Sequence, residues 1–251
     1  MSERLPRATV AATLLRSFLI QGSWNYHTMI GTGFGFAMLP GLRWIYGDDE
    51  ASLDRSVERH VEHFNAHPYL STLALGASLR MEQEGAEPET VRRFKSAVRG
   101  PLGGLGDQLV WATWLPGVAV LALVVYWFGA PAGVVVGLFL TVYNIGHVGL
   151  RIWGLRAGLR SGRAVGARLA EANLAGWTHR LQPVVVLLLG VLMGALVGGE
   201  GEFPTLGGPW GLVGLAGFLA GLLGGHRVWR PAAVVTTIAI CVIAFWGVWS
   251  A

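Results

Sequence analysis

Five apolar runs that follow Asp107 constrain the fold of this chain more than any other feature. Residues 1 to 107 carry 11 Lys or Arg and 12 Asp or Glu, whereas the remainder carries 8 Arg and 3 Glu. The five runs are Gln108–Phe128, Ala132–Leu150, Pro183–Val197, Trp210–Leu223 and Ala232–Trp249. A helix that crosses a bilayer needs about 20 apolar residues, so the first, second and fifth runs are long enough to cross. The third and fourth are short and rich in glycine, which suits tilted, broken or re-entrant helices.

This distribution predicts an all-α integral membrane protein in two parts. Residues 1–107 are expected to form a cytoplasmic or interfacial helical region with amphipathic and re-entrant helices. Residues 108–251 are expected to form a membrane-embedded region of about three to five transmembrane or re-entrant helices. Overall, 53% of the residues are apolar and 14% are charged, against about a quarter charged in soluble domains.

The basic character of the chain argues for a membrane partner and not for nucleic acid. Its isoelectric point is near 9.7, but the excess arginines after residue 107 lie between apolar runs, as the positive-inside rule predicts. The segment 151–180 holds six arginines, whereas the charged residues of the segment 198–209 are Glu200 and Glu202. We therefore expect a cytoplasmic N-terminus and an outside C-terminus. The single cysteine, Cys241, excludes a disulfide within the chain.

Helices are also expected in the charged part. Thr9 is a candidate cap for a helix over residues 10–21, and residues 26–39 form an apolar stretch that Pro40-Gly41 should end. The acidic run Asp48-Asp49-Glu50 predicts the start of an amphipathic helix. Pro88 predicts the start of a basic helix, after a turn around Gly85.

The junction between the two parts holds four glycines in Gly100-Pro101-Leu102-Gly103-Gly104-Leu105-Gly106-Asp107. This density of glycine predicts a sharply turned element that breaks the helix near the membrane surface. A phosphate-binding loop is a weaker interpretation, because no Lys-Ser/Thr pair follows the glycines. Asp107 should either cap the next helix or occupy a protected polar site.

Two groups of polar residues could carry chemistry. His60, His63 and His67 have the spacing of one helix face, which would suit a transition metal, but no carboxylate or cysteine completes a closed site, and a polar helix end is the simpler explanation. Asn144 and His147 lie one turn apart in an apolar run, where polar groups more often join helices than bind ligands.

Three motifs carry a resemblance to a known family. They are Gln21-Gly22-Ser23-Trp24-Asn25, Phe64-Asn65-Ala66-His67-Pro68-Tyr69, and the glycine-rich junction with its continuation Gln108-Leu109-Val110-Trp111. Together they resemble the IID component of the mannose-family (mannose/fructose/sorbose) sugar permeases of the phosphotransferase system, over roughly residues 13 to 198.

The resemblance implies a bacterial inner-membrane subunit that acts with a IIC membrane subunit in translocating a hexose. It also implies IIA and IIB phosphocarrier proteins as partners and a higher oligomer of IIC–IID units. Phosphate would come from a phosphohistidine on IIB, so no catalytic residue, cofactor or metal is expected on this chain. Candidate contacts to substrate or partner are Gln21, Trp24, Asn25, Asn65, His67, Gly104, Gly106, Asp107, Asn144 and His147.

Two other classes of function stay open at the level of sequence. One is a membrane scaffold or regulatory receptor that does not transport. The other is a metal-dependent membrane enzyme that uses the histidine group.

Overall fold

The computed structural model describes residues 4–197, and every regular element in that range is helical. The elements are α1 (Arg7–Ser17), α2 (Gly31–Tyr46), α3 (Glu50–Val61), α4 (Ser71–Gln83), α5 (Pro88–Gly106), the π-helix η1 (Asp107–Trp114), α6 (Leu115–Trp127), α7 (Ala132–Ser161), the 3₁₀ turn η2 (Gly162–Ala164), α8 (Val165–Ala172) and α9 (Leu174–Val197). The apolar runs Trp210–Leu223 and Ala232–Trp249 lie outside the described residues.

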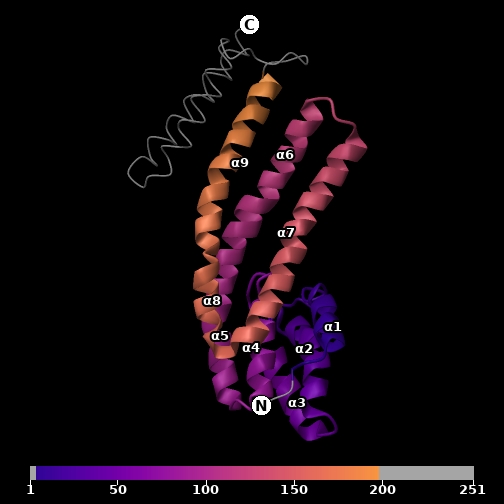
Figure 1. Ribbon diagram of the computed structural model, residues 1–251, viewed down its shortest axis with the longest axis vertical. Helices are drawn as coiled ribbons and strands as arrows, with labels where there is room; N and C mark the ends of the chain where they lie inside the picture. Colours follow the sequence, from indigo (N-terminus) through magenta and orange to yellow (C-terminus); the bar gives the residue numbers. More distant parts are fainter. Residues whose placement is uncertain (1–3, 198–251) are drawn as a thin grey trace, which may run out of the picture. The chain divides into compact units, whose positions relative to one another are not determined.

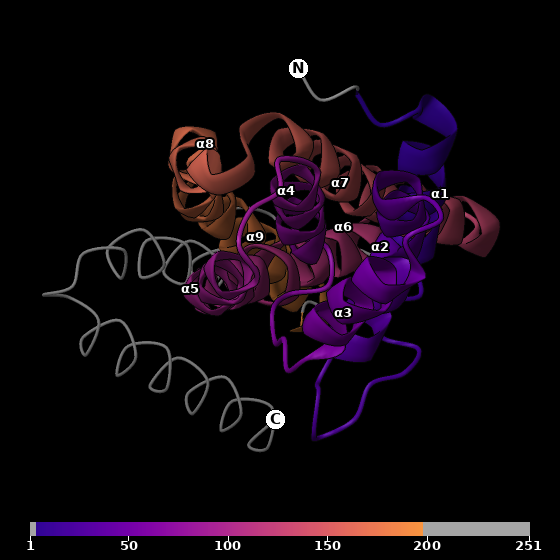
Figure 2. The same ribbon diagram turned by 90° about the horizontal axis from the view of Figure 1, so that it is seen from below.

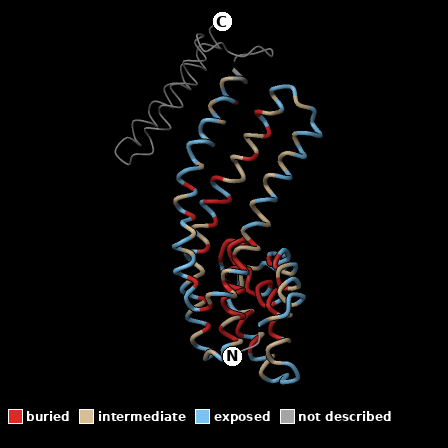
Figure 3. The backbone as a smooth tube through the Cα atoms, in the orientation of Figure 1, coloured by how far each residue is buried: buried red, intermediate tan, exposed pale blue. Residues whose placement is uncertain are grey.

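The chain divides into two compact units. The first unit comprises Met1–Ala112 and Asn144–Gly176, and the second comprises Thr113–Tyr143 and Trp177–Ala251. In the first unit, α2 packs against α1, α3 and α4, and α4 also packs against α5 (Figures 1 and 2). The buried residues of the described chain concentrate in this unit (Figure 3).

Local signals set several helix starts as the sequence predicts. The Asp49 side chain accepts a hydrogen bond from the Ser52 backbone N–H at 3.0 Å, which caps α3. Pro88 occupies the first turn of α5, where its missing N–H costs nothing. Gly85, in the turn before it, has a φ of +69°, a conformation that glycine adopts without strain.

Close backbone contacts hold α7 against α4. A Cβ at Gly158 would lie 2.2 Å from the Leu73 carbonyl oxygen, and one at Gly76 would lie 2.4 Å from the Leu155 carbonyl oxygen. Gly154 meets the Thr72 side chain in the same way. The two helices therefore approach as closely as small-residue helix pairs in membranes do.

The described part of the second unit is apolar and exposes much of its apolar surface. Leu123, Val134 and Met193 are each more than half exposed. Two long, mainly helical stretches, Pro88–Trp127 and Ala132–Gly194, each contain a segment long and apolar enough to cross a membrane.

The predicted break at the glycine-rich junction is wrong. Residues 100–107 are helical, and the chain runs without interruption from α5 through η1 into α6. Leu102 and Gly106, four residues apart, are buried, so packing of this face outweighs the low helix propensity of glycine. The wide π turns fall just before Pro116, which cannot donate a hydrogen bond to the carbonyl four residues earlier.

Other predicted boundaries also shift. The helix predicted for residues 10–21 is α1, which starts at Arg7 after Pro6 and ends at Ser17, so Thr9 does not cap it. α2 continues through Pro40 to Tyr46, and the Phe36 carbonyl oxygen, to which Pro40 cannot donate, accepts from Arg16 Nη1 at 3.3 Å. The third apolar run belongs to α9, which begins at Leu174 and has 24 residues, enough to span a bilayer.

Candidate functional site

A buried arginine organises the polar interior of the first unit. Arg151 lies on α7 with 2% of its surface exposed. Its Nε donates to Nε2 of His147 at 2.8 Å, one helical turn earlier. Its Nη1 donates to the carbonyl oxygen of Ser17 and to the Ser17 hydroxyl, the latter at 3.2 Å. Arg151 therefore joins the end of α1 to α7.

Aromatic rings enclose the same guanidinium group. Its central carbon lies 4.8 Å from the ring centroid of Phe18 and 5.0 Å from that of Tyr69. The His147 ring stacks on Tyr69 with centroids 3.9 Å apart and an interplanar angle of 20°. Such cation–π contacts are strongest where water is excluded, as here.

His67 completes this group, and we call the six residues Ser17, Phe18, His67, Tyr69, His147 and Arg151 the Arg151 hub. His67 is 2% exposed, and its Nδ1 accepts from the Tyr69 backbone N–H at 3.2 Å. The ring proton therefore sits on Nε2, which has no hydrogen-bond partner within the described residues. Burial, and then the nearby Arg151 and His147, lower the pKa of His67 to about 4, so it is neutral at pH 7.

Gly106 lets α5 approach His67. A Cβ at Gly106 would lie 2.2 Å from the His67 Cβ. The indole of Trp111 lies 5.3 Å from the His67 ring, centroid to centroid. The first unit thus brings two of the sequence motifs together at His67.

A second buried cluster is centred on Glu82 of α4. Arg59 donates to both carboxylate oxygens at 2.8 to 3.0 Å, His60 Nε2 donates at 2.8 Å, and the Tyr46 hydroxyl donates as well. Lys95 Nζ donates to the Arg59 carbonyl oxygen at 2.6 Å, near the end of α3. This cluster ties α2, α3, α4 and α5 together.

The charge states of the cluster follow from burial and hydrogen bonding. Burial alone would raise the pKa of Glu82, but hydrogen bonds from His60 and Arg59 outweigh it and hold that pKa at about 2. Burial lowers the pKa of His60 to about 4 despite the carboxylate beside it. The contact between His60 and Glu82 is therefore a hydrogen bond from a neutral imidazole, and Arg59 is the ionic partner.

The remaining predicted site residues lie apart from these clusters or at their edges. The Asn25 side chain accepts from the backbone N–H groups of His27 and Thr28, each at 2.9 Å, so it shapes its own loop. Trp24 is 47% exposed and packs edge-on against Tyr26. The exposed positions are Gln21, Asn65, Gly104, Asp107 and Asn144.

The three histidines proposed for a metal do not share a helix face. α3 ends at Val61, so His63 and His67 lie beyond it, and His60 is engaged with Glu82. Within residues 4–197, no group of three or more His, Cys, Asp or Glu is placed to hold a metal ion. The geometry that motivated a metal-dependent enzyme is therefore absent from the described part of the chain.

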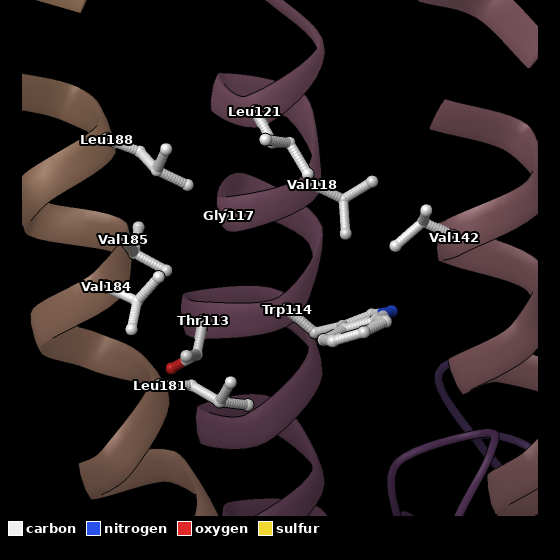
Figure 4. Close-up of a pocket in the computed structure, with 10 residues that line it drawn as sticks. All are labelled: Thr113, Trp114, Gly117, Val118, Leu121, Val142, Leu181, Val184, Val185 and Leu188. Carbon is white, nitrogen blue, oxygen red and sulfur yellow. The ribbon is translucent and has the colours of Figure 1, made fainter. Parts of the chain in front are cut away.

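The second unit contains a pocket of about 260 Å³ between α6, α7 and α9 (Figure 4). Its lining consists of Thr113, Trp114, Gly117, Val118, Leu121, Val142, Leu181, Val184, Val185 and Leu188. The indole N–H of Trp114 donates to the Tyr143 carbonyl oxygen at 3.4 Å, which leaves the Thr113 hydroxyl as the main polar side-chain group. A hexose needs many hydrogen-bonding partners, so this lining does not suit a sugar.

Sequence reasoning missed the centres of both clusters, Arg151 and Glu82, although it singled out His60 as a possible metal ligand. The sequence predicts that Arg151 lies in the arginine-rich segment 151–180 that connects two apolar runs, but α7 continues to Ser161 and η2 and α8 follow it. The available signal was the four-residue spacing from His147 to Arg151, which places both on one helix face.

Comparison with known proteins identifies the family. The model of the PTS system mannose/fructose/sorbose family IID component matches residues 4–202. The mannose-specific EIID component of Escherichia coli K12 is 30% identical over 200 residues, which cover 78% of this chain and 69% of that protein. The fructose permease IID component of Bacillus subtilis is 26% identical over 196 residues, covering 76% and 70%.

Solved structures agree with this match. A cryo-EM structure of the mannose transporter ManYZ in complex with microcin E492 aligns with a TM-score of 0.61 and 26% identity, covering 97% of this chain and 94% of that one. A second structure, described as a membrane protein, aligns with a TM-score of 0.68 at 24% identity and supports the fold. The expected all-α integral membrane fold is confirmed, and the chain belongs to the IID components of the mannose/fructose/sorbose family of the bacterial phosphotransferase system.

Proposed function

We propose that this chain works with a IIC membrane subunit to move a hexose across the bacterial inner membrane. Phosphate reaches the sugar from a IIB phosphocarrier, which a IIA protein supplies, and this chain contributes no catalytic group. The family match over residues 4–202 carries the proposal. The outward-facing apolar side chains of the second unit support it, because they suit lipid or a membrane partner. A scaffold that does not transport is not favoured, because the matched relatives are permease components.

Co-purification tests the partnership. With an affinity tag on this chain, the cognate IIC subunit is expected to remain bound in mild detergent and to elute in a higher oligomer of IIC–IID units. Expressed alone, the chain is expected to be poorly stable, because its apolar and glycine-lined faces need a partner. A monodisperse, stable monomer without IIC would contradict the proposal.

We also propose that the N-terminus faces the cytoplasm and the C-terminus faces the outside. The support is the bias of arginines to residues 151–180, set against the acidic segment 198–209. Single cysteines placed at Ser161 and Thr205 in a chain without Cys241 should react with impermeant reagents from opposite sides. Labelling of both from the cytoplasm would refute this orientation.

We propose that sugar transport is most sensitive to substitutions in the Arg151 hub. Of the ten candidate contacts, His67 and His147 belong to it and Gly106 packs on it. The hub fixes the His147 ring, because Arg151 donates to its Nε2 and Tyr69 stacks on its face. The exposed candidates are better placed to contact the IIC subunit, and they are Gln21, Trp24, Asn65, Gly104, Asp107 and Asn144. Asn25 is better placed to hold the loop that presents Trp24.

Substitution of His147 by Phe separates packing from chemistry. Phe keeps an aromatic ring against Tyr69 but has no ring nitrogen. The variant complex should assemble with IIC and show at least a tenfold lower initial rate of sugar uptake. Uptake at the wild-type rate would contradict a role of His147 in transport. Failure of the variant to assemble with IIC would also contradict it and would indicate a structural role.

A further inference from the structure

Three exposed arginines follow the membrane-crossing part of α7. Arg156 and Arg160 lie on the last turns of α7, and Arg163 lies in η2 directly after it. We call these three residues the arginine face. Each is exposed, and none forms an ion pair within residues 4–197.

The direction of the arginine face follows from helix geometry. Gly154 and Gly158 are buried against α4, and Arg156 and Arg160 each come two residues after one of them. Two residues correspond to about 200° around an α-helix. The two arginines therefore point away from α4, on the side of α7 that the first unit leaves open.

Two carboxylates near the arginine face, Glu84 in space and Glu171 in the sequence, are already engaged. Glu84, close to Gly162, accepts from Arg80 at 2.7 Å, and Glu171 accepts from Arg168 at 2.7 Å. Three neighbouring positive charges with no ion pair within residues 4–197 create a positive local potential that attracts anions.

The length of α7 places this surface at the edge of the bilayer. Its 30 residues span about 45 Å, whereas the hydrocarbon core is about 30 Å thick, so about ten residues project beyond it. The apolar part ends at Leu150, and Arg156 and Arg160 lie about 7 and 14 Å further along the axis than Arg151. Long arginine side chains can reach back to the headgroup level from these positions.

We infer that Arg156, Arg160 and Arg163 form a surface that binds the phosphate groups of anionic phospholipids. The positive charge of the arginine face and its position at the edge of the bilayer both favour a lipid headgroup as the ligand. Arginine suits phosphate because its planar group donates two parallel hydrogen bonds. The inference rests on α7 crossing the membrane and is independent of which sugar is transported.

The test measures lipid preference in the assembled complex. The chain is purified with its IIC subunit in nanodiscs of phosphatidylglycerol and phosphatidylcholine, and the lipids that stay bound are counted by native mass spectrometry. The wild type should prefer phosphatidylglycerol, and 1 M salt should weaken that preference because it shortens the screening length to about 3 Å. In the triple variant R156Q/R160Q/R163Q, the ratio of bound phosphatidylglycerol to bound phosphatidylcholine should fall at least fivefold. Fivefold is about what one such arginine contributes.

Matched variants make the result specific. R168Q removes an exposed arginine of the same segment that already pairs with Glu171, and it should change the preference less than twofold. R156K/R160K/R163K keeps the charge and should retain most of the preference. If the triple Gln variant fails to assemble, the single variants R156Q and R160Q, each expected to lower the preference measurably, replace it.

Three results would overturn the inference. One is an unchanged preference in assembled Gln variants. Another is an equal loss in R168Q, which would indicate diffuse charge in place of a defined surface. The third is an unchanged lipid preference with weaker binding of the soluble IIB protein, which would make a protein the occupant of the arginine face.

Discussion

The interiors of the two units differ in polarity. The first unit buries charged and polar groups, including Arg59, Glu82, Lys95 and Arg151, each at most 5% exposed. The described part of the second unit has an apolar pocket and turns large apolar side chains outward. Among the described residues, buried charged side chains that need a partner are therefore a feature of the first unit.

This difference teaches where specificity resides. Apolar contacts tolerate small shifts, since a displaced methyl group still meets other apolar atoms. A buried charge that loses its partner has no replacement and costs several kcal/mol. Substitutions in the first unit should accordingly have larger effects than similar ones in the second.

The largest effect is expected from Glu82→Gln. The change leaves the buried guanidinium of Arg59 without its counter-charge, so the free energy of unfolding should fall by about 3–5 kcal/mol. Thermal unfolding of the purified complex measures this. Glu84→Gln, which affects a half-exposed pair with Arg80, is the control and should cost about 0.5 kcal/mol or less. Equal effects of the two changes would refute the importance of burial.

Gly158→Ala should be nearly as damaging. The new Cβ would meet backbone atoms of Leu73 and Ala77, which cannot move aside without separating α4 from α7, at a cost of about 3 kcal/mol. Gly149→Ala, on the same helix with no atom within 4 Å of the new Cβ, should be neutral or slightly stabilising. The pair is compared by the yield of assembled complex and by unfolding temperature.

Acid should weaken the first unit in two steps. Because the pKa of His60 falls from 6.5 to about 4 on folding, the unfolded chain binds the proton first, and stability declines as the pH drops from 6.5 toward 4. Glu82 adds a decline from 4.5 toward 2 by the same reasoning. His67, whose pKa also falls from 6.5 to about 4 on folding, adds to the same step, so the first step should cost up to about 2 kcal/mol per histidine by pH 5. Unfolding temperatures between pH 7.5 and pH 4 test it, and a flat profile would contradict it.

The smallest effect is expected from Gly117→Ala in the second unit. The new Cβ would lie 2.7 Å from the tip of the Val185 side chain, which can rotate into the pocket. Alanine also favours the helix by about 1 kcal/mol, so stability should change by about 1 kcal/mol or less. A loss of stability as large as that expected for Gly158→Ala would contradict the proposed difference between the units.

The features that sequence predicts well here are those set by local chemistry. The helix start at Asp48-Asp49-Glu50, the Pro88 start and the turn at Gly85 depend on neighbouring residues alone, and all are found. The membrane fold follows from apolar run length, and the family follows from three motifs. The division of the chain at residue 107 stays a prediction about the membrane boundary.

The features that sequence missed depend on contacts between distant segments. Propensity predicts a break at residues 100–107, but the fit of Gly106 on His67 keeps that segment helical. The contact of Arg151 with Ser17 joins residues 134 positions apart, and no local pattern announces it. Of the ten candidate residues, the structure brings His67 and His147 into one hub with Gly106 beside it, and the role of all ten stays a proposal.

The most direct test of the central proposal is the initial rate of sugar phosphorylation in cells that lack the native permease. The cells express the cognate IIC, IIB and IIA proteins, with or without this chain, and receive labelled mannose and related hexoses. We predict that sugar phosphate accumulates at least tenfold faster when this chain is present. Equal rates with and without it, in membranes that contain the assembled IIC–IID complex, would contradict the proposal.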